Sequence, residues 1–322
     1  MIISHEMQTV TKISAFLDLE VPLVLAVGTF DGVHLGHQKI LECAREKAAR
    51  LSGKAVVLTF QVHPLSIVAP ERAPRLLSSE SQKETLLAKF GVDYWLHLPF
   101  TPTVAGTEPE DFIKELMAAL PHLAVICAGM GWHFGKGGKK GRGNMDLLKK
   151  LALECHFEVE EIGPVMLGGV PVSSTRIRRA LSVAATSGSL QEVTACLGRP
   201  YALEGVVIEG AQLGRTLGVP TCNFDPQEME GKQLPFPGVY STEVLLDGVR
   251  YRSVTNIGRC PTITSRGEDQ VQVETHLLDF AGNLYGKKIE IHFLSYLRPE
   301  QKFETIAALQ AQLYHDIVVR RA

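Results

Sequence analysis

The stretch VPLVLAVGTFDGVHLGHQKI, residues 21–40, joins an apolar run to a helical pattern through a glycine-rich turn. Residues 21–27 are typical of a buried strand, and apolar residues at helical spacing predict a helix from His37 to about Leu51. A Thr-x-x-Glu capping-box spacing at 107–110 predicts another helix, which ends before Pro121. Further strand-like runs alternate with these helical patterns, at residues 55–60, 94–98, 123–128 and 157–162. Such alternation predicts a parallel sheet, in which ligands lie at the carboxyl ends of the strands.

The turn after the first strand is suited to a phosphate group. Its glycines permit a close approach of a ligand to the backbone, and the helix start near Gly36 offers unpaired N–H groups and the positive end of a dipole. His34 and His37 could hydrogen-bond an α-phosphoryl group as negative charge builds on it. The alternatives are a structural turn and half of a His-x-x-His metal site; the Gly-Lys-Ser/Thr ending of a Walker loop is absent. The turn predicts a nucleotide site with both histidines as catalytic groups, containing Gly28, Thr29, Phe30, His34, Gly36 and His37.

Later loops should reach the same edge of the sheet. His63 follows the second strand and could contact the nucleotide or hydrogen-bond within its own loop. Ser174 and Thr175 precede Arg178 at a strand-to-helix junction after the fifth strand. Hydroxyls combined with an arginine suit the β- and γ-phosphates of a nucleotide better than they suit helix capping alone. The glycine-rich, cationic segment 135–142 is expected to be a mobile, solvated loop.

In the second half of the chain, apolar and polar residues alternate with a period of two. Asp247-Gly248 is a hairpin signal between two strand-like runs, and a closing helix is expected from Glu300. The strand-like runs span 201–208, 239–246, 249–254, 271–278 and 289–297. They predict an antiparallel sheet or small barrel. The small-residue stretch 183–189 is typical of a linker, so we expect two domains, residues 1–185 and 186–322.

Composition excludes several classes of protein. The chain has 322 residues, 45% of them hydrophobic and 21% charged, which is typical of a globular protein. A net charge of −2 provides no overall attraction to nucleic acid or an anionic membrane. The N-terminus lacks a secretion signal, and no run approaches the roughly 18 apolar residues of a membrane span. Six scattered cysteines indicate buried thiols and not a zinc site. We expect a cytoplasmic monomer or weak homo-oligomer that binds neither nucleic acid nor membrane.

Motifs in both halves resemble one enzyme family. His34-Leu35-Gly36-His37 and Ser173-Ser174-Thr175-Arg176-Ile177-Arg178 resemble motifs of nucleotidyltransferases. Further motifs occur in family order at 197–201, 210–223, 256–258, 261–262, 274–276, 284–286 and 297–300. Almost end to end, the chain resembles the bacterial bifunctional riboflavin kinase/FAD synthetase family.

The resemblance implies a fold and two reactions. It implies an α/β Rossmann-like nucleotidyltransferase domain, followed by an antiparallel six-stranded β-barrel kinase domain with a C-terminal helix. The barrel would phosphorylate riboflavin with ATP to give FMN. The first domain would transfer AMP from a second ATP to FMN, giving FAD and pyrophosphate. ATP is then a co-substrate, Mg²⁺ is required and no prosthetic group is expected.

The kinase residues follow from this resemblance and make chemical sense. Glu274 would take the proton from the ribityl 5′-hydroxyl and contact the substrate. Thr221 and Asn223 would hold Mg²⁺, with Asn223 also near the substrate and Cys222 pointing the other way. By resemblance, Arg298 would contact the flavin. The ATP-binding residues of this half are Gly210, Gly214, Arg215, Gly218 and Thr221.

Two positions depart from the family pattern. Gly131 stands where Asp or Asn is usual, and Val62 stands where Pro is usual. The first change favours, as an alternative, a riboflavin kinase with weak or altered FMN adenylyltransferase activity. Two further functions stay open: a nucleotidyltransferase for another small phosphate substrate, with a regulatory barrel, and an RNA-binding module.

Overall fold

The computed structural model describes residues 7–183, 187–210, 213–263 and 269–321, which divide into two compact units. The first unit extends to Pro74 and resumes at Glu80–Ser173. The second combines Arg75–Ser79 with the chain from Ser174 onward. The predicted domain boundary between residues 185 and 186 lies outside the described residues.

The first unit is built on a parallel sheet of six strands in the order β1-β4-β3-β2-β5-β6. This confirms the prediction from strand–helix alternation. β2 (Leu23–Val27) is buried along its whole length, as a central strand covered on both faces should be. The other strands are β1 (Gln8–Val10), β3 (Lys54–Phe60), β4 (Tyr94–Leu98), β5 (Leu123–Gly129) and β6 (Glu158–Ile162). β7 (Met166–Leu167) and β8 (Val170–Pro171) form a separate hairpin.

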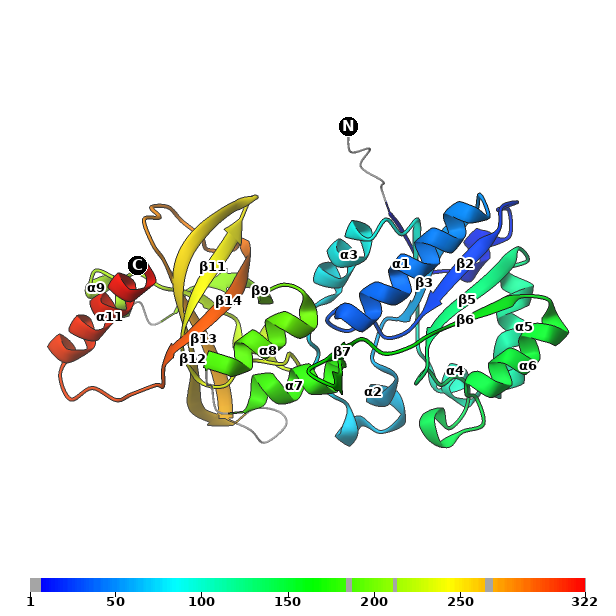
Figure 1. Ribbon diagram of the computed structural model, residues 1–322. Helices are drawn as coiled ribbons and strands as arrows, with labels where there is room; N and C mark the ends of the chain where they lie inside the picture. Colours follow the sequence, from blue (N-terminus) through cyan, green and yellow to red (C-terminus); the bar gives the residue numbers. More distant parts are fainter. Residues whose placement is uncertain (1–6, 184–186, 211–212, 264–268, 322) are drawn as a thin grey trace. The chain divides into compact units, whose positions relative to one another are not determined.

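Helices cover both faces of this sheet (Figure 1). Alternate strand residues enter two apolar clusters. One cluster packs against α1 (Leu35–Arg50) and α3 (Glu80–Lys89), and the other against α5 (Pro109–Ala119) and α6 (Met145–Cys155). Shorter helical segments are η1 (Ile13–Phe16), α2 (Pro64–Val68), η2 (Pro70–Arg72), α4 (Pro102–Gly106) and η3 (Gly138–Lys140). The three layers confirm the Rossmann-like fold.

The capping box expected at residues 107–110 does not form. Glu108 is the N-cap of α5 and makes no side-chain bond to the helix. Pro109 occupies the first turn, where its missing N–H removes one of the donors that a cap would satisfy. The Thr107 hydroxyl donates instead to the Thr103 carbonyl at 3.2 Å.

The second unit contains a closed antiparallel barrel in the order β10-β13-β12-β11-β14-β9. Asp247 and Gly248 have φ of +49° and +82°, which makes the predicted hairpin turn a type I′ turn. The strands are β9 (Tyr201–Ile208), β10 (Cys222–Phe224), β11 (Gly238–Leu246), β12 (Val249–Ile263), β13 (Asp269–Leu277) and β14 (Lys288–Arg298). The six-stranded barrel implied by the family resemblance is confirmed.

Four hydroxyl side chains fill part of the barrel interior. Thr242, Ser253, Thr255 and Thr275 are buried and linked by hydrogen bonds of 2.8 Å. Since side chains alternate along a strand, the inward Thr275 places its neighbours Glu274 and His276 on the outer face of β13. On β13, the residues that point outward can therefore contact a substrate on the outer face of the barrel, and the residues that point inward cannot.

The closing helix, α11 (Ile306–Arg321), begins six residues later than the predicted Glu300. The Thr305 hydroxyl accepts a hydrogen bond from the Ala308 N–H at 3.2 Å, so Thr305 sets the start of the helix. The remaining helices of this unit are α7 (Ser174–Ser182), α8 (Ser187–Leu197), α9 (Leu213–Thr216) and α10 (Pro226–Met229).

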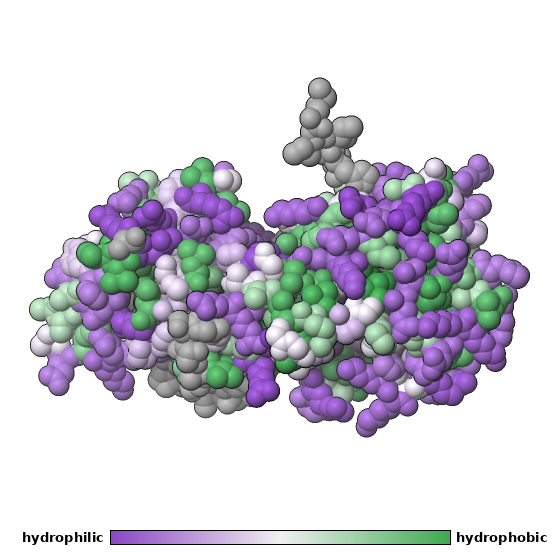
Figure 2. Space-filling view, in the orientation of Figure 1, coloured by the Kyte–Doolittle hydropathy of each residue, from purple (hydrophilic) through white to green (hydrophobic). Residues whose placement is uncertain are grey.

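The visible surface is mostly hydrophilic. Figure 2 shows polar and charged side chains over most of this face, with apolar residues in smaller patches. Within the described ranges, no helix combines the length and the apolar character needed to cross a membrane.

Candidate active sites

The first candidate site lies where the strand order of the parallel sheet reverses. β2 lies between β3 and β5, and Val27 of β2 is in register with Ala128 of β5. In open α/β sheets, ligands bind outside the carboxyl ends of the two strands at this switch point. The loops that follow β2 and β5 begin with Gly28 and Met130, so the topology brings the predicted histidine turn and the Gly131 segment to one edge.

The two predicted histidines lie together at the start of α1. Their rings stack with centroids 3.7 Å apart and 17° between the planes. His34 is the N-cap, and its Nδ1 accepts a hydrogen bond from the His37 N–H at 3.3 Å. In a neutral His34 ring, the proton is therefore on Nε2, which can act as a donor. A side chain at Gly36 would have its Cβ 3.1 Å from His34 Cε1, so any larger residue would have to displace the His34 ring slightly. α1 begins at Leu35, two residues before the predicted start.

The turn that carries these histidines is strained. Phe30 and Val33 have φ of +48° and +37°, a region that non-glycine residues rarely occupy and β-branched residues avoid most strongly. Each such residue costs about 1–3 kcal/mol, and strain of this kind is concentrated at functional sites. Both side chains are fully buried, and the Phe30 ring lies 5.1 Å from the His37 ring. Packing therefore holds the strained turn in place. Thr29 is exposed.

His63 and the residues after the fifth strand occupy other local environments. His63 is the N-cap of α2, where its Nδ1 accepts from the Leu65 N–H at 3.2 Å. Ser174 and Thr175 begin α7, which belongs to the second compact unit. In that unit, Arg178 Nε donates to the Arg75 carbonyl at 2.7 Å. Their contact with ATP stays a prediction.

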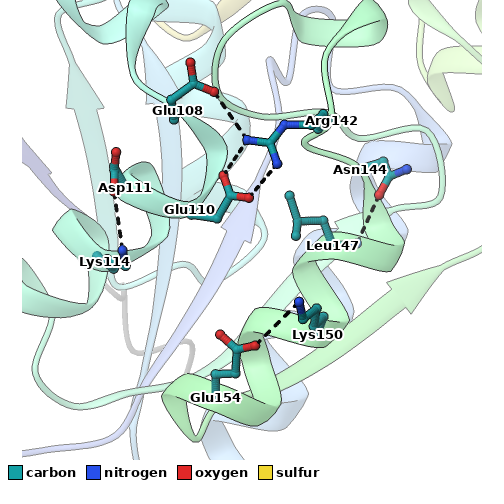
Figure 3. Close-up of polar contacts among 9 residues, drawn as sticks. All are labelled: Glu108, Glu110, Asp111, Lys114, Arg142, Asn144, Leu147, Lys150 and Glu154. Carbon is teal, nitrogen blue, oxygen red and sulfur yellow. Dashed lines mark hydrogen bonds and ion pairs between the residues drawn. The ribbon is translucent and has the colours of Figure 1, made fainter.

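The cationic segment 135–142 is anchored to the start of α5 (Figure 3). Arg142 donates to both carboxylate oxygens of Glu110, at 2.9 and 3.2 Å, and lies 3.5 Å from Glu108. Lys136 pairs with Glu108 at 3.2 Å. Exposed pairs contribute little individually, but a bidentate arginine within a small network restricts the loop. These pairs connect the loop to the start of α5, and its mobility stays a prediction.

Gly131 lies in open space near the same sheet edge. A Cβ added at this residue would have no atom within 4 Å. Next to it, His133 Nδ1 lies 2.9 Å from the Gly131 carbonyl oxygen, and Trp132 stacks on Phe134 at 4.9 Å. There is therefore room at residue 131 for the polar side chain that the family usually has.

The second candidate site is on the outer face of the barrel. Strand register places Glu274 of β13 directly opposite Asn223 of β10 on one side and Asn256 of β12 on the other. Asn256 Nδ2 also donates to Glu300 Oε1 at 3.4 Å. Burial, and secondarily the negative charge of Glu300, raises the pKa of the Glu274 carboxyl. A half-buried carboxylate with a raised pKa is suited to act as a general base.

The glycine-rich segment lies beside this carboxylate. His276 Nδ1 lies 2.8 Å from the Pro220 carbonyl oxygen, which holds the segment before Thr221 next to β13. Desolvation lowers the pKa of His276, so the ring is neutral at physiological pH. A Cβ at Gly210 would lie 2.3 Å from Asn223 Nδ2, so glycine is needed for the backbone to pass over Asn223.

The remaining residues of this segment that were predicted to bind ATP are Gly214, Arg215 and Gly218. The Gly214 carbonyl accepts from the N–H groups of Leu217 and Val219, and Gly218 has φ of +80°. Arg215 is exposed on α9. Ala211 and Gln212, in the same loop, lie outside the described residues.

The donor set fits Mg²⁺. Cys222 is buried, so Thr221 and Asn223 share the outer, half-buried side of the chain, as their spacing predicts. They offer a hydroxyl and an amide oxygen. Mg²⁺ prefers oxygen ligands, takes few of them from the protein and completes its shell with phosphates and water.

Arg298 is tied to the closing helix. Its Nε lies 3.0 Å from Asp316 Oδ1, and its Nη2 lies 2.8 Å from Asp316 Oδ2. Asp316 is only 3% exposed. Sequence reasoning assigned no role to Asp316, Asn256, Glu300 or His276. Strand alternation in Glu274-Thr275-His276 could have placed His276 on the same face as Glu274. The positions of Asp316, Asn256 and Glu300 follow only from contacts between residues far apart in the sequence.

Two family models match the chain. The model described as FAD synthetase matches residues 18–176, and the model described as riboflavin kinase matches residues 197–322. A protein of Escherichia coli (strain K12), described as bifunctional riboflavin kinase/FMN adenylyltransferase, is 34% identical over 299 residues, covering 92% of this chain and 91% of its own. A Pseudomonas fluorescens protein with the same description is 36% identical over 302 residues, covering 93% and 92%.

A solved structure extends the likeness to the fold. The crystal structure of a Streptococcus pneumoniae protein, described as a macrolide-efflux protein, matches with a TM-score of 0.83 and 27% identity. The match covers 97% of this chain and 98% of that one. With two family models in order and identities above 30% over nine-tenths of the sequence, the chain belongs to the bifunctional riboflavin kinase/FMN adenylyltransferase family.

Proposed function

We propose that this chain makes FAD from riboflavin in two ATP-dependent steps, each with its own set of catalytic residues. The observation that carries the proposal is the presence in one chain of two different side-chain clusters whose chemistry suits phosphate transfer. One is a stacked histidine pair at the switch point of a parallel sheet. The other is a half-buried carboxylate between two asparagines on a barrel. Riboflavin, FMN and ATP are the substrates.

In the barrel, Glu274 takes the proton from the riboflavin 5′-hydroxyl. The hydroxyl oxygen attacks the γ-phosphorus of ATP, the bond between this phosphorus and the β,γ-bridging oxygen breaks, and ADP leaves. Asn223 and Asn256 flank the carboxylate and limit its motion. Gly210, Gly214 and Gly218 let the backbone approach the phosphates, with Arg215 as a charge partner. Thr221 and Asn223 would hold Mg²⁺, which neutralises phosphate charge when bound.

In the parallel-sheet unit, an oxygen of the FMN phosphate attacks the α-phosphorus of ATP. Pyrophosphate leaves, and its departure requires no proton transfer from FMN. His34 and His37 donate hydrogen bonds to the α-phosphoryl oxygens as charge builds on them. The strained turn from Gly28 to Phe30 presents its backbone to the nucleotide. Contacts of ATP with His63, Ser174, Thr175 and Arg178 are part of the proposal.

Separation of flavins by chromatography tests the proposal. Purified protein with riboflavin, ATP and Mg²⁺ should form FMN first and FAD later. A nucleotidyltransferase with a regulatory barrel would leave riboflavin unchanged. The match of residues 197–322 to the riboflavin kinase family model does not favour that alternative. An RNA-binding module would produce neither flavin. Action in the cytoplasm, a monomeric or weakly associated state and the lack of a nucleic-acid partner stay predictions.

Replacement of Gly131 by asparagine is expected to improve FAD formation. Because the position is open, the fold should be unchanged, and one added hydrogen bond of about 0.5–1.5 kcal/mol should lower the KM for FMN about two- to tenfold. Steady-state kinetics of FMN adenylylation measure this. Gly106→Asn, at another glycine with open space around it, is the matched control. A folded Gly131→Asn enzyme with an unchanged or higher KM would contradict the expectation.

A further inference from the structure

Arg298, which the family resemblance places at the flavin, forms an ion pair with Asp316 of α11. Both carboxylate oxygens of Asp316 accept from Arg298, in a bidentate arrangement with N···O distances of 2.8–3.1 Å. Gln312, one helical turn earlier on α11, donates to Asp316 Oδ1 at 2.9 Å. Arg298 Nη1 donates to the Pro299 carbonyl at 3.0 Å. The guanidinium is therefore fixed in position and in plane.

These bonds leave part of the guanidinium for another partner. Arginine has five N–H groups in one plane, and the hydrogen bonds to Asp316 and Pro299 use one on each nitrogen. One N–H on each terminal nitrogen remains, and 17% of the Arg298 side chain is exposed. A planar, partly neutralised guanidinium is suited to stack on or donate to a flat, uncharged ring system.

The same helix also contacts the glycine-rich segment. Gln310 Nε2 donates to the Leu217 carbonyl at 3.0 Å. The Tyr314 hydroxyl lies 2.9 Å from where a Cβ of Gly218 would be. α11 therefore touches the segment proposed to bind ATP and the arginine proposed to bind the flavin.

We propose that Asp316 is a positioning residue of the riboflavin kinase, which acts by holding the Arg298 guanidinium against the isoalloxazine ring of riboflavin. The inference rests on the proposed function of the barrel. Asp316 itself is too deeply buried to reach the substrate, at 3% exposure. Its effect is transmitted through the orientation of Arg298.

Asp316→Asn in the full chain tests this role. Loss of the charge-assisted bonds should raise the KM for riboflavin, and the Kd for riboflavin from flavin fluorescence, by about tenfold. The KM for ATP and the kcat should change by less than about threefold. The thermal midpoint of the same sample, together with the kcat of the kinase, shows whether the barrel is folded. Asp279→Asn is the matched control, because Asp279 pairs with Arg321 of the same helix at an exposed position.

A second variant separates positioning from folding. Breaking one partner of a buried pair can destabilise a protein, whereas replacing both by apolar residues often does not. Arg298→Met with Asp316→Leu should recover the thermal midpoint of the wild type but keep the raised KM for riboflavin. If the Arg298–Asp316 pair as a whole served only the stability of the barrel, the double variant would instead restore the KM.

The outcomes distinguish this inference from the proposed function. If the wild type makes no FMN, the proposed function is wrong. If the wild type makes FMN, and folded Asp316→Asn protein binds riboflavin as tightly as wild type, only the role of Asp316 is wrong. Recovery of the wild-type KM in the double variant would also overturn it.

Discussion

Enzyme carrying Glu274→Gln should lose riboflavin phosphorylation by about 10²–10⁴-fold, the range typical for loss of a general base. Glutamine keeps the shape of the side chain between Asn223 and Asn256 but cannot accept the hydroxyl proton. Conversion of supplied FMN to FAD should continue, because the parallel-sheet unit is unchanged. Rates of both steps on one preparation measure the effect. Glu290→Gln, at a β14 carboxylate paired with His292, is the control.

The raised pKa of Glu274 adds a dependence on pH. The base is active only when ionised, so kinase activity should fall, as pH decreases, at a higher pH than an ordinary carboxyl would give. The pKa of the Glu274 carboxyl is higher in the folded protein than in the unfolded chain. The protonated carboxyl therefore favours the folded state at pH values below the unfolded-state pKa, and this stabilisation is lost as pH rises through the folded-state pKa. Glu274→Gln should therefore be more thermostable than wild type near pH 7, with the advantage disappearing below about pH 4.5, the ordinary glutamate value. A folded variant that lost both activities would refute the assignment.

The second large effect is expected for His37→Ala. FAD formation should fall by about 10²–10³-fold, the loss typical when one donor to a developing charge is removed. FMN should accumulate, since the barrel still phosphorylates riboflavin. Chromatography of flavins over time measures both. His122→Ala, before β5 at the amino end of the strands, is the matched control because it lies at the opposite edge of the sheet. A folded His37→Ala enzyme that makes FAD at the wild-type rate would exclude the histidine pair from the chemistry.

Much of the fold could be predicted because its strands have strong periodic patterns. The continuous apolar run of β2 and the alternation of β9 correspond to a strand buried on both faces and a strand buried on one. β1 was missed because a strand of three residues carries no usable period. The start of α11 was misplaced because Pro299-Glu300 resembles a helix start, whereas Thr305 provides the capping hydroxyl.

The candidate sites were predicted less completely. The sequence marks His34, His37 and Glu274 through short motifs, but it does not show strand register. Asn256 is recognised only because β12 pairs with β13, and Asp316 only because α11 folds back onto Arg298. The positive φ of Phe30 and Val33 could not be foreseen, since neither residue is a glycine and tertiary packing imposes the conformation.

The central claim is that one chain cleaves ATP at two different phosphorus atoms in two sites. The most direct measurement supplies riboflavin with ATP labelled at the γ-phosphate in one reaction and at the α-phosphate in another. The γ-label should enter FMN and be kept in FAD, whereas the α-label should enter FAD alone, with ADP and pyrophosphate formed in equal amounts once all FMN is consumed. An α-label that never reaches a flavin, or a γ-label absent from FMN, would contradict it.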